Sequence, residues 1–239
     1  MAFIPLYDTN PLRFIRWPYV NWGLIALNVI IFVFFEGAGF SEESNRAAFY
    51  GFGLIPATLS DPTLQRDVYA VVPDWATLLT YAFVHGDFWH ILGNMLFLFV
   101  FGDNVEDSLG HVRYLLFYCL CAVGAGLAFY LSVPGSESPL IGASGAIAGV
   151  VAAYLILHPN AKIWVLILAR IPLRISALWV LGFWFLLQLM SGLAAVGYAI
   201  GGAGGVAWWA HVGGFLSGML LLALLRPVAL TRPGRGLRS

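Results

Sequence analysis

The chain has 239 residues, of which 60% are hydrophobic and 10% are charged. Soluble domains carry about a quarter charged residues, so this composition predicts a protein with little water-facing surface. The formal net charge is zero, which gives no reason to expect nucleic acid as a partner. The length suits one compact bundle and leaves no room for a sizeable second domain.

Six apolar segments approach the roughly 20 residues that a membrane-spanning helix needs. They cover residues 20–36, 87–104, 112–132, 142–158, 175–195 and 206–225. The sequence therefore predicts an all-α, polytopic membrane protein with a bundle of six transmembrane helices. Asp87 is a favourable N-cap, so the second span is expected to begin there and residues 75–85 to form interfacial structure.

The Lys and Arg residues indicate the orientation, because cytoplasmic loops of membrane proteins are enriched in them. With a cytoplasmic N-terminus, ten of the twelve lie on the inner side, and only Arg46 and Arg66 lie outside. Both termini are therefore expected in the cytoplasm. The predicted organisation is a cytoplasmic segment over 1–19, a six-helix domain over 20–225 with an external loop over about 37–74, and a cytoplasmic tail over 226–239.

Two connections have unusual compositions. Residues 162–174 form an apolar stretch interrupted by Arg170, Pro172 and Arg174, so they are too charged to span and are expected to lie along the inner surface. Residues 196–206 contain five glycines and no charge. Such a composition fits a moving cap or a flexible connector.

Polar side chains from three predicted spans reach a similar depth on the outer side. Ser144 opens the fourth span, and His211 lies early in the sixth. His90 and Asn94 are four residues apart in the second span, so they share one helix face. Polar groups inside a bilayer are costly unless they are paired, and they tend to mark function. These four residues are therefore the candidate site.

Small residues favour close approach of the helices that carry the serine and the histidine. Ser144 is followed by Gly145, while Gly214 and Gly218 share a helix face with His211. Small residues let two helix backbones come close in a membrane. That proximity is required for a nucleophile–base hydrogen bond of about 2.6–3.2 Å.

No Asp or Glu follows Glu137, so no carboxylate is at hand to complete a catalytic triad. The sequence therefore predicts a Ser144–His211 dyad of an intramembrane serine hydrolase, with the histidine oriented by packing. Neutral imidazole would take the serine proton, and fixed donors would stabilise the oxyanion. The candidate donors are the Ser144 backbone N–H, the Asn94 amide and His90.

Less specific interpretations stay open at this point. A serine in a membrane helix usually bonds its own backbone, and His211 could simply tie helices together. His85 and His90 could bind a metal with a further ligand, although five residues on a helix separate them by about 140°. Metal transport is therefore the weaker alternative. Neither a cofactor nor a resident metal is expected.

The motifs resemble those of bacterial rhomboid intramembrane serine proteases, over about residues 17–225. The matching segments are the family's Gly-x-Ser-Gly at 142–145, its His-x-x-x-Asn at 90–94 with His85 upstream, its Ala-His-x-x-Gly at 210–214, and its cytoplasmic turn at 102–106 followed by Gly110. One departure is that Trp75 precedes Ala76, where the family often has Trp-Arg.

This resemblance implies a six-helix core with a water-filled cavity that is open to the outside. Ser144 would be the nucleophile and His211 the base, with an oxyanion site of His90, Asn94 and the Ser144 N–H. The supporting positions are His85, Gly142, Gly145, Gly214 and Gly218.

The resemblance also implies the partners and the location. The substrates would be single-span or polytopic membrane proteins, cut in the lipid bilayer near a small residue, and the location would be the bacterial inner membrane. Relatives that lack the serine or the histidine are non-proteolytic binding proteins, which is the leading alternative. Bulky residues of the fifth span are a candidate gate for substrate entry: Trp179, Phe183, Trp184 and Phe185.

Overall fold

The computed structural model describes residues 3–61, 63–64, 67–167, 170–197 and 207–225. A long helix occupies each of the six segments that the sequence singled out. These helices are α1 (Tyr19–Phe34), α5 (Phe88–Leu109), α6 (His111–Ser132), α7 (Ser144–Leu157), α8 (Ala177–Gly197) and α9 (Trp208–Leu225). The predicted 196–206 connector falls almost wholly outside the described residues, and the predicted tail over 226–239 lies entirely outside them.

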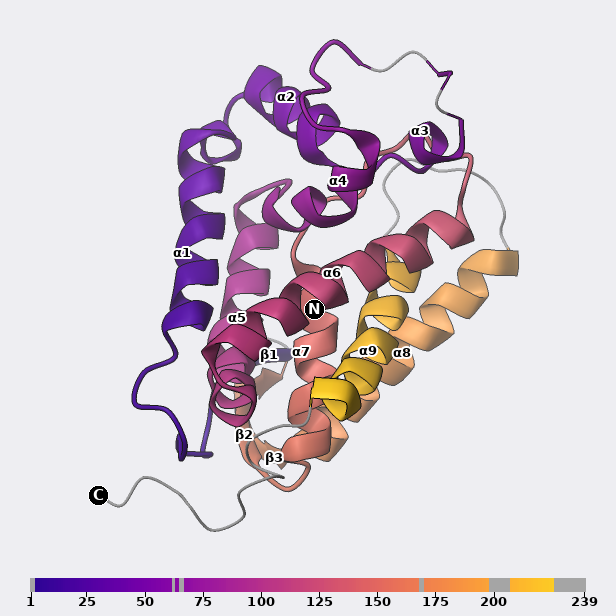
Figure 1. Ribbon diagram of the computed structural model, residues 1–239. Coiled ribbons are helices and arrows are strands. Elements are labelled where there is room, and N and C mark those ends of the chain that lie inside the picture. Colours follow the sequence, from indigo (N-terminus) through magenta and orange to yellow (C-terminus); the bar gives the residue numbers. More distant parts are fainter. Residues whose placement is uncertain (1–2, 62, 65–66, 168–169, 198–206, 226–239) are drawn as a thin grey trace.

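Four of the described helices are long and apolar enough to cross a membrane: α5, α6, α8 and α9. Helices α1 and α7 are shorter apolar helices of 16 and 14 residues. At 1.5 Å per residue α7 is only about 21 Å long, less than the ~30 Å hydrocarbon core. Residues 145–154 of α7 are all buried, and α7 lies in the middle of the bundle (Figure 1). Because protein rather than lipid surrounds α7, its length need not match the bilayer.

Short helices fill the predicted external loop. They are the 3₁₀ turn η1 (Gly37–Gly39), α2 (Glu42–Phe52), α3 (Pro56–Ser60), α4 (Asp74–Thr80) and the 3₁₀ turn η2 (Tyr81–Phe83). Ser41 caps α2 by accepting the Ser44 N–H at 3.2 Å. Leu54 pairs with Leu140 in an isolated β-bridge, which ties this region to the segment that leads into α7. Helices α2, α3 and α4 lie together at one end of the bundle (Figure 1).

The prediction of an all-α fold was wrong in one respect, because the described residues also form a three-stranded antiparallel sheet. Its order is β1 (Phe3–Asp8), β2 (Lys162–Ile167), β3 (Ile171–Ser176), and it lies at the end of the bundle opposite α2–α4 (Figure 1). Ile163 and Val165 of β2 are fully buried and alternate with more exposed neighbours, which is the period-two pattern of a half-buried strand. The sequence did not predict β3 as a strand because it contains Pro172 and Arg174. Proline is tolerated in a sheet only at an edge.

Helix α5 also continues beyond its predicted end at residue 104. Residues 102–106 resemble a turn in sequence but are helical, and the helix ends only at Gly110. Gly110 has φ +80°, a conformation that favours glycine, and α6 begins at the next residue. Acidic residues are typical of an exposed loop, but those near the end of α5 are buried in the fold.

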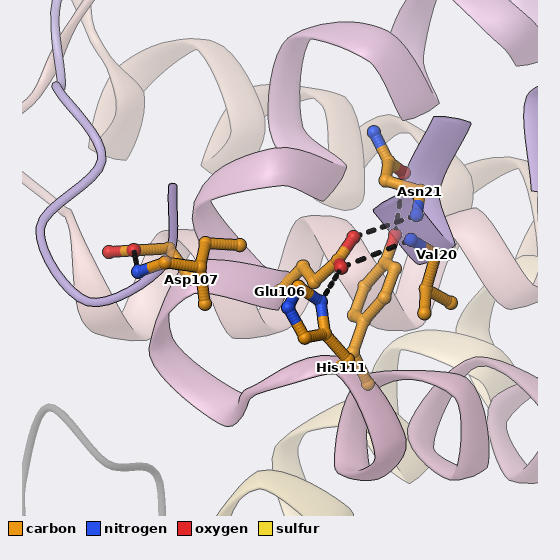
Figure 2. Close-up of polar contacts among 7 residues, drawn as sticks. Val20, Asn21, Glu106, Asp107 and His111 are labelled. Carbon is orange, nitrogen blue, oxygen red and sulfur yellow. Dashed lines mark hydrogen bonds and ion pairs between the residues drawn. The ribbon is translucent and has the colours of Figure 1, made fainter. Parts of the chain in front are cut away.

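Glu106 and Asp107 hold the N-terminal segment against the end of α5 (Figure 2). Glu106 accepts the N–H groups of Val20 and Asn21 at 3.1 and 2.7 Å, and it also bonds His111. The first N–H groups of a helix lack partners within the helix, so Glu106 acts as a distant cap for α1. Asp107 accepts three successive N–H groups of residues 13–15 at 2.7–3.1 Å.

Candidate active site

A serine and a histidine from two different helices meet in the bundle. Ser144 is the first residue of α7, and its Oγ lies 2.7 Å from Nε2 of His211 on α9. This distance falls in the range of about 2.6–3.2 Å expected for a nucleophile and its base. His211 is 8% exposed, so the pair lies inside the protein with only limited access to solvent.

Glycines set the distance between the two helices. A Cβ added at Gly218 would lie 2.5 Å from Cα of Gly149, and one added at Gly214 would lie 2.9 Å from the carbonyl carbon of Gly145. A Cβ added at Gly145 would lie 2.6 Å from Cβ of Ala125 on α6. No side chain fits at such distances, so Gly214 and Gly218 permit the backbone approach that brings the serine to the histidine, and Gly145 permits the close approach of α6.

A polar residue that the sequence reasoning missed completes the surroundings of His211. Oε1 of Gln188 on α8 lies 2.8 Å from Nδ1 of His211, and Gln188 is 7% exposed. The prediction that packing alone orients the histidine was therefore incomplete. The signal was present, because a glutamine in the middle of an apolar span is as unusual as the serine and the histidine. It was overlooked because only carboxylates were considered as orienting groups.

Asn94 and His90 of α5 lie beside the loop that precedes Ser144. Gly142 in this loop has φ +109°, and a Cβ there would lie 2.6 Å from Nε2 of His90 and 3.7 Å from Nδ2 of Asn94. Any residue but glycine would thus be strained and would fill the space in front of both side chains. Nδ2 of Asn94 is buried and has no hydrogen-bond partner among the residues that the structure describes. A buried amide donor without a partner is available to bind an oxygen of a ligand.

The hydrogen bonds at the start of α5 determine which ring nitrogen of His90 is the donor. Asp87 caps α5 by accepting the His90 backbone N–H at 2.9 Å, as the sequence predicted for this aspartate. Nδ1 of His90 accepts the Gly86 N–H at 3.3 Å. A neutral imidazole carries one N–H, so Nε2 of His90 is the donor and faces Gly142.

His85 supports the same loop through the backbone of Ala143. Its Nε2 accepts a long hydrogen bond of 3.5 Å from the Ala143 N–H, and burial lowers the pKa of His85 to about 3, so the ring is neutral and able to accept. The His85 backbone N–H donates to Oε2 of Glu36 at 2.9 Å, and Glu36 is fully buried. Sequence reasoning missed Glu36, although it is an isolated acid at the end of the first apolar segment.

The four aromatic residues of the candidate gate point in different directions. Trp179 and Phe183 are 71% and 54% exposed on the outer face of α8. The Trp184 ring lies 6.0 Å from the His211 ring. Phe185 stacks on Phe215 of α9 with ring centroids 3.8 Å apart. Trp184 and Phe185 are therefore the pair that face the neighbouring helices.

The arrangement as a whole has the parts of an acyl-transfer site. It combines a hydroxyl, an imidazole that can accept its proton, and unpaired or free donors beside them.

His85 and His90 lie close together, with ring centroids 5.2 Å apart. Within the described part of the chain, no group of three or more His, Cys, Asp or Glu side chains is placed to hold a metal ion.

Comparison with known proteins gives one family. The model of the rhomboid domain matches residues 72–228. Rhomboid protein 1, mitochondrial, from Saccharomyces cerevisiae is 32% identical over 166 residues, which are 66% of this chain and 43% of that protein. The putative rhomboid protease YdcA of Bacillus subtilis is 29% identical over 143 residues, which are 59% of this chain and 64% of that protein.

A third relative, Rhomboid-like protein 11, chloroplastic, from Arabidopsis thaliana, is 35% identical over 85 residues, or 36% of this chain and 30% of that protein. The chain thus spans less than two thirds of the length of each of these relatives. The rhomboid model nevertheless covers more than half of the 239 residues, and the chain belongs to the rhomboid family.

Proposed function

We propose that this protein is an intramembrane serine endopeptidase that cleaves transmembrane helices of membrane proteins. The observation that carries the proposal is the 2.7 Å contact between Oγ of Ser144 and Nε2 of His211 in an apolar helical bundle. The names of its relatives support it, since the Bacillus subtilis protein is described as a putative rhomboid protease. The relatives share about 30% identity, so the residue roles below rest on the geometry of this chain.

The reaction follows from this pair. Oγ of Ser144 forms a bond to the scissile carbonyl carbon while its proton passes to Nε2 of His211, and the carbonyl π electrons move to the oxygen. The oxyanion then re-forms the carbonyl, the C–N bond breaks, and His211 gives its proton to the leaving amine. Water repeats the sequence on the acyl-enzyme, with His211 again taking and returning one proton, which frees the new carboxylic acid and the serine.

The oxyanion site is assigned to three donors. Nδ2 of Asn94 has no partner among the described residues, and Nε2–H of His90 faces Gly142. The Ser144 N–H belongs to the first turn of α7, where helical N–H groups lack intrahelical partners. The positive end of the α7 dipole adds to the stabilisation of negative charge there. Donors that are fixed before the reaction cost no reorganisation during it.

The membrane arrangement is proposed on the same basis. All six long helices cross the bilayer; α7 is enclosed by its neighbours, whereas α1 lies at the outside of the bundle and exposes most of its large apolar side chains. Both termini lie in the cytoplasm because ten of the twelve Lys and Arg residues fall on that side. The protease domain is 20–225, with residues 1–19 and the tail cytoplasmic. We assign the protein to the bacterial type of the family and to the inner membrane, with single-span or polytopic membrane proteins as substrates. The non-proteolytic binding alternative is disfavoured, since Ser144 and His211 are both present and in contact.

Cleavage by the purified protein in liposomes tests the proposal. The substrate is a labelled single-span protein, and the variants are Ser144→Ala and His211→Ala. In a soluble serine protease the loss of either group costs about 10⁶ in rate, so both variants should show only background cleavage while keeping the helical content of the wild type. A rate within about tenfold of the wild type for either variant would contradict the enzyme assignment.

Replacement of an oxyanion donor gives a second prediction. Asn94→Ala should lower kcat by about 10² and leave KM nearly unchanged, because such a donor acts mainly on the transition state. His90 and the Ser144 N–H retain part of the stabilisation, which places the effect at the lower end of the known range. An Asn94→Ala enzyme that changed only KM would rule out this role for the amide.

A further inference from the structure

Gln188 is a buried amide in a helix that is otherwise almost entirely apolar. It lies in the middle of α8 and is 7% exposed. An amide inside a bilayer costs free energy unless it finds a hydrogen-bond partner. The partner that it finds is Nδ1 of His211, at 2.8 Å from its Oε1.

The direction of this hydrogen bond decides the protonation pattern of the ring. Oε1 of Gln188 faces Nδ1 of His211, and an amide oxygen can only accept, so this arrangement places the hydrogen on Nδ1. A neutral imidazole has one N–H, which leaves a lone pair on Nε2. That lone pair faces Oγ of Ser144 at 2.7 Å. The opposite tautomer would place a hydrogen between Nε2 and the serine oxygen and would leave the ring unable to take the serine proton.

We infer that Gln188 is the positioning residue of the dyad: it holds His211 in the orientation and tautomer that accept the proton of Ser144. The inference rests on the proposed function of Ser144 and His211. The hydrogen bond that the structure describes for the Gln188 side chain is the one to His211. Gln188 acts only through the histidine, in the place that a carboxylate takes in a catalytic triad.

The surroundings of the ring explain why an amide serves here. The Trp184 and Trp208 rings lie 6.0 and 6.4 Å from the His211 ring, and no acid occurs in the chain after Glu137. A carboxylate at this depth would bring a charge into an apolar bundle, and an isolated buried charge is far more costly than a buried amide. A glutamine supplies the same acceptor geometry without the charge.

Two substitutions distinguish the loss of the hydrogen-bond acceptor from a change in the size of the side chain. Gln188→Leu keeps a similar size and removes the acceptor, whereas Gln188→Glu keeps an acceptor oxygen. Leu186→Ala serves as the matched control, because Leu186 is on the same helix and is 49% exposed. Each variant is assayed for kcat and KM with a transmembrane substrate, and for the rate at which a small fluorophosphonate labels Ser144. Labelling depends on the serine–histidine pair but needs no entry of a helix.

Loss of the acceptor should slow both reactions together. Gln188→Leu leaves the Nδ1–H of His211 buried and unpaired, and we expect kcat and the labelling rate to fall by about 10- to 100-fold with little change in KM. The carboxyl group of Gln188→Glu avoids the buried charge by keeping its proton, and its carbonyl oxygen still accepts the Nδ1–H. Gln188→Glu should therefore recover most of both rates, and Leu186→Ala should match the wild type. A Gln188→Leu enzyme that is labelled at the wild-type rate, or a Gln188→Glu enzyme as slow as Gln188→Leu, would overturn the inference.

A measurement on the wild type keeps the inference testable if Gln188→Leu does not fold. The ¹⁵N NMR spectrum of histidine-labelled protein in detergent distinguishes protonated from unprotonated ring nitrogens, and the His211 signals are those missing from His211→Ala. Protonated Nδ1 and unprotonated Nε2 are expected, and the reverse pattern would refute the role of Gln188. Failure of the proposed function looks different: the wild type would then neither cleave the substrate nor react with the fluorophosphonate at Ser144.

Discussion

The close approach of α7 and α9 makes Gly214→Ala a sharp test of the site geometry. An added Cβ would lie 2.9 Å from the carbonyl carbon of Gly145, whereas carbon–carbon contacts are optimal at about 3.5–4.0 Å. The added Cβ would come closer still to the carbonyl oxygen of Gly145, so the two backbones must move apart by at least about 1 Å. Gly145 follows Ser144 directly, and Gly214 lies one helical turn after His211, so this shift is passed to the dyad.

The magnitude follows from the contact itself. Adding about 1 Å to the 2.7 Å between Oγ of Ser144 and Nε2 of His211 breaks the hydrogen bond, since a separation near 3.6 Å no longer counts as one. A misplacement of about 1 Å can cost about 10² in rate, so kcat should fall about 100-fold. Overpacking lowers the free energy of unfolding by about 1–3 kcal/mol. Replacing glycine by alanine within a helix raises it by about 1 kcal/mol, so the protein should remain folded.

The assay compares Gly214→Ala with Gly23→Ala, the same change in another helix. A Cβ at Gly23 in α1 would meet nothing within 4 Å, so this control should keep the wild-type kcat. Cleavage in liposomes gives kcat, and thermal unfolding in detergent gives the change in stability. The reasoning would be refuted by a Gly214→Ala enzyme with kcat within about threefold of the wild type, or by an equal loss in Gly23→Ala.

Three further predictions concern residues around the site. Glu106→Ala should lower the free energy of unfolding by about 1–3 kcal/mol, because it leaves N–H groups of α1 without their acceptor; an unchanged unfolding curve would contradict this. Glu36→Gln should keep kcat, since an amide oxygen can still accept the His85 N–H, whereas Glu36→Leu should lower it about tenfold; equal kcat values in the two variants would argue against this contact. Trp184→Ala should speed cleavage of helical substrates more than Trp179→Ala, since only Trp184 packs inward; equal effects would count against a gate at Trp184.

The features that could be predicted from the sequence are those marked by a residue whose polarity differs from that of its neighbours in the chain. Ser144, His211 and Asn94 are polar residues in apolar segments, and each lies in or beside the site. The length of an apolar run is a local property, so it located all six long helices to within a few residues, except at the end of α5. Asp87 was recognised as a cap because a cap depends only on its next few residues.

The parts that could not be predicted depend on contacts between distant segments. The end of α5 remains helical because Glu106 and Asp107 accept N–H groups from residues 13–21, about ninety positions away in the chain. The sheet was missed because its strands are short and β3 contains a proline and an arginine. Gln188 was not predicted for a chemical reason, since a carboxylate is the usual partner of a catalytic histidine and an amide carries no charge to mark it.

Covalent labelling shows directly whether His211 makes Ser144 a nucleophile. The wild type and His211→Ala are each treated with a fluorophosphonate, digested, and analysed by mass spectrometry to locate the adduct. One adduct is expected in the wild type, on Ser144, and it should be lost in His211→Ala, in parallel with the loss of cleavage in liposomes. An adduct on another residue, or equal labelling of Ser144 in His211→Ala, would contradict this activation of Ser144.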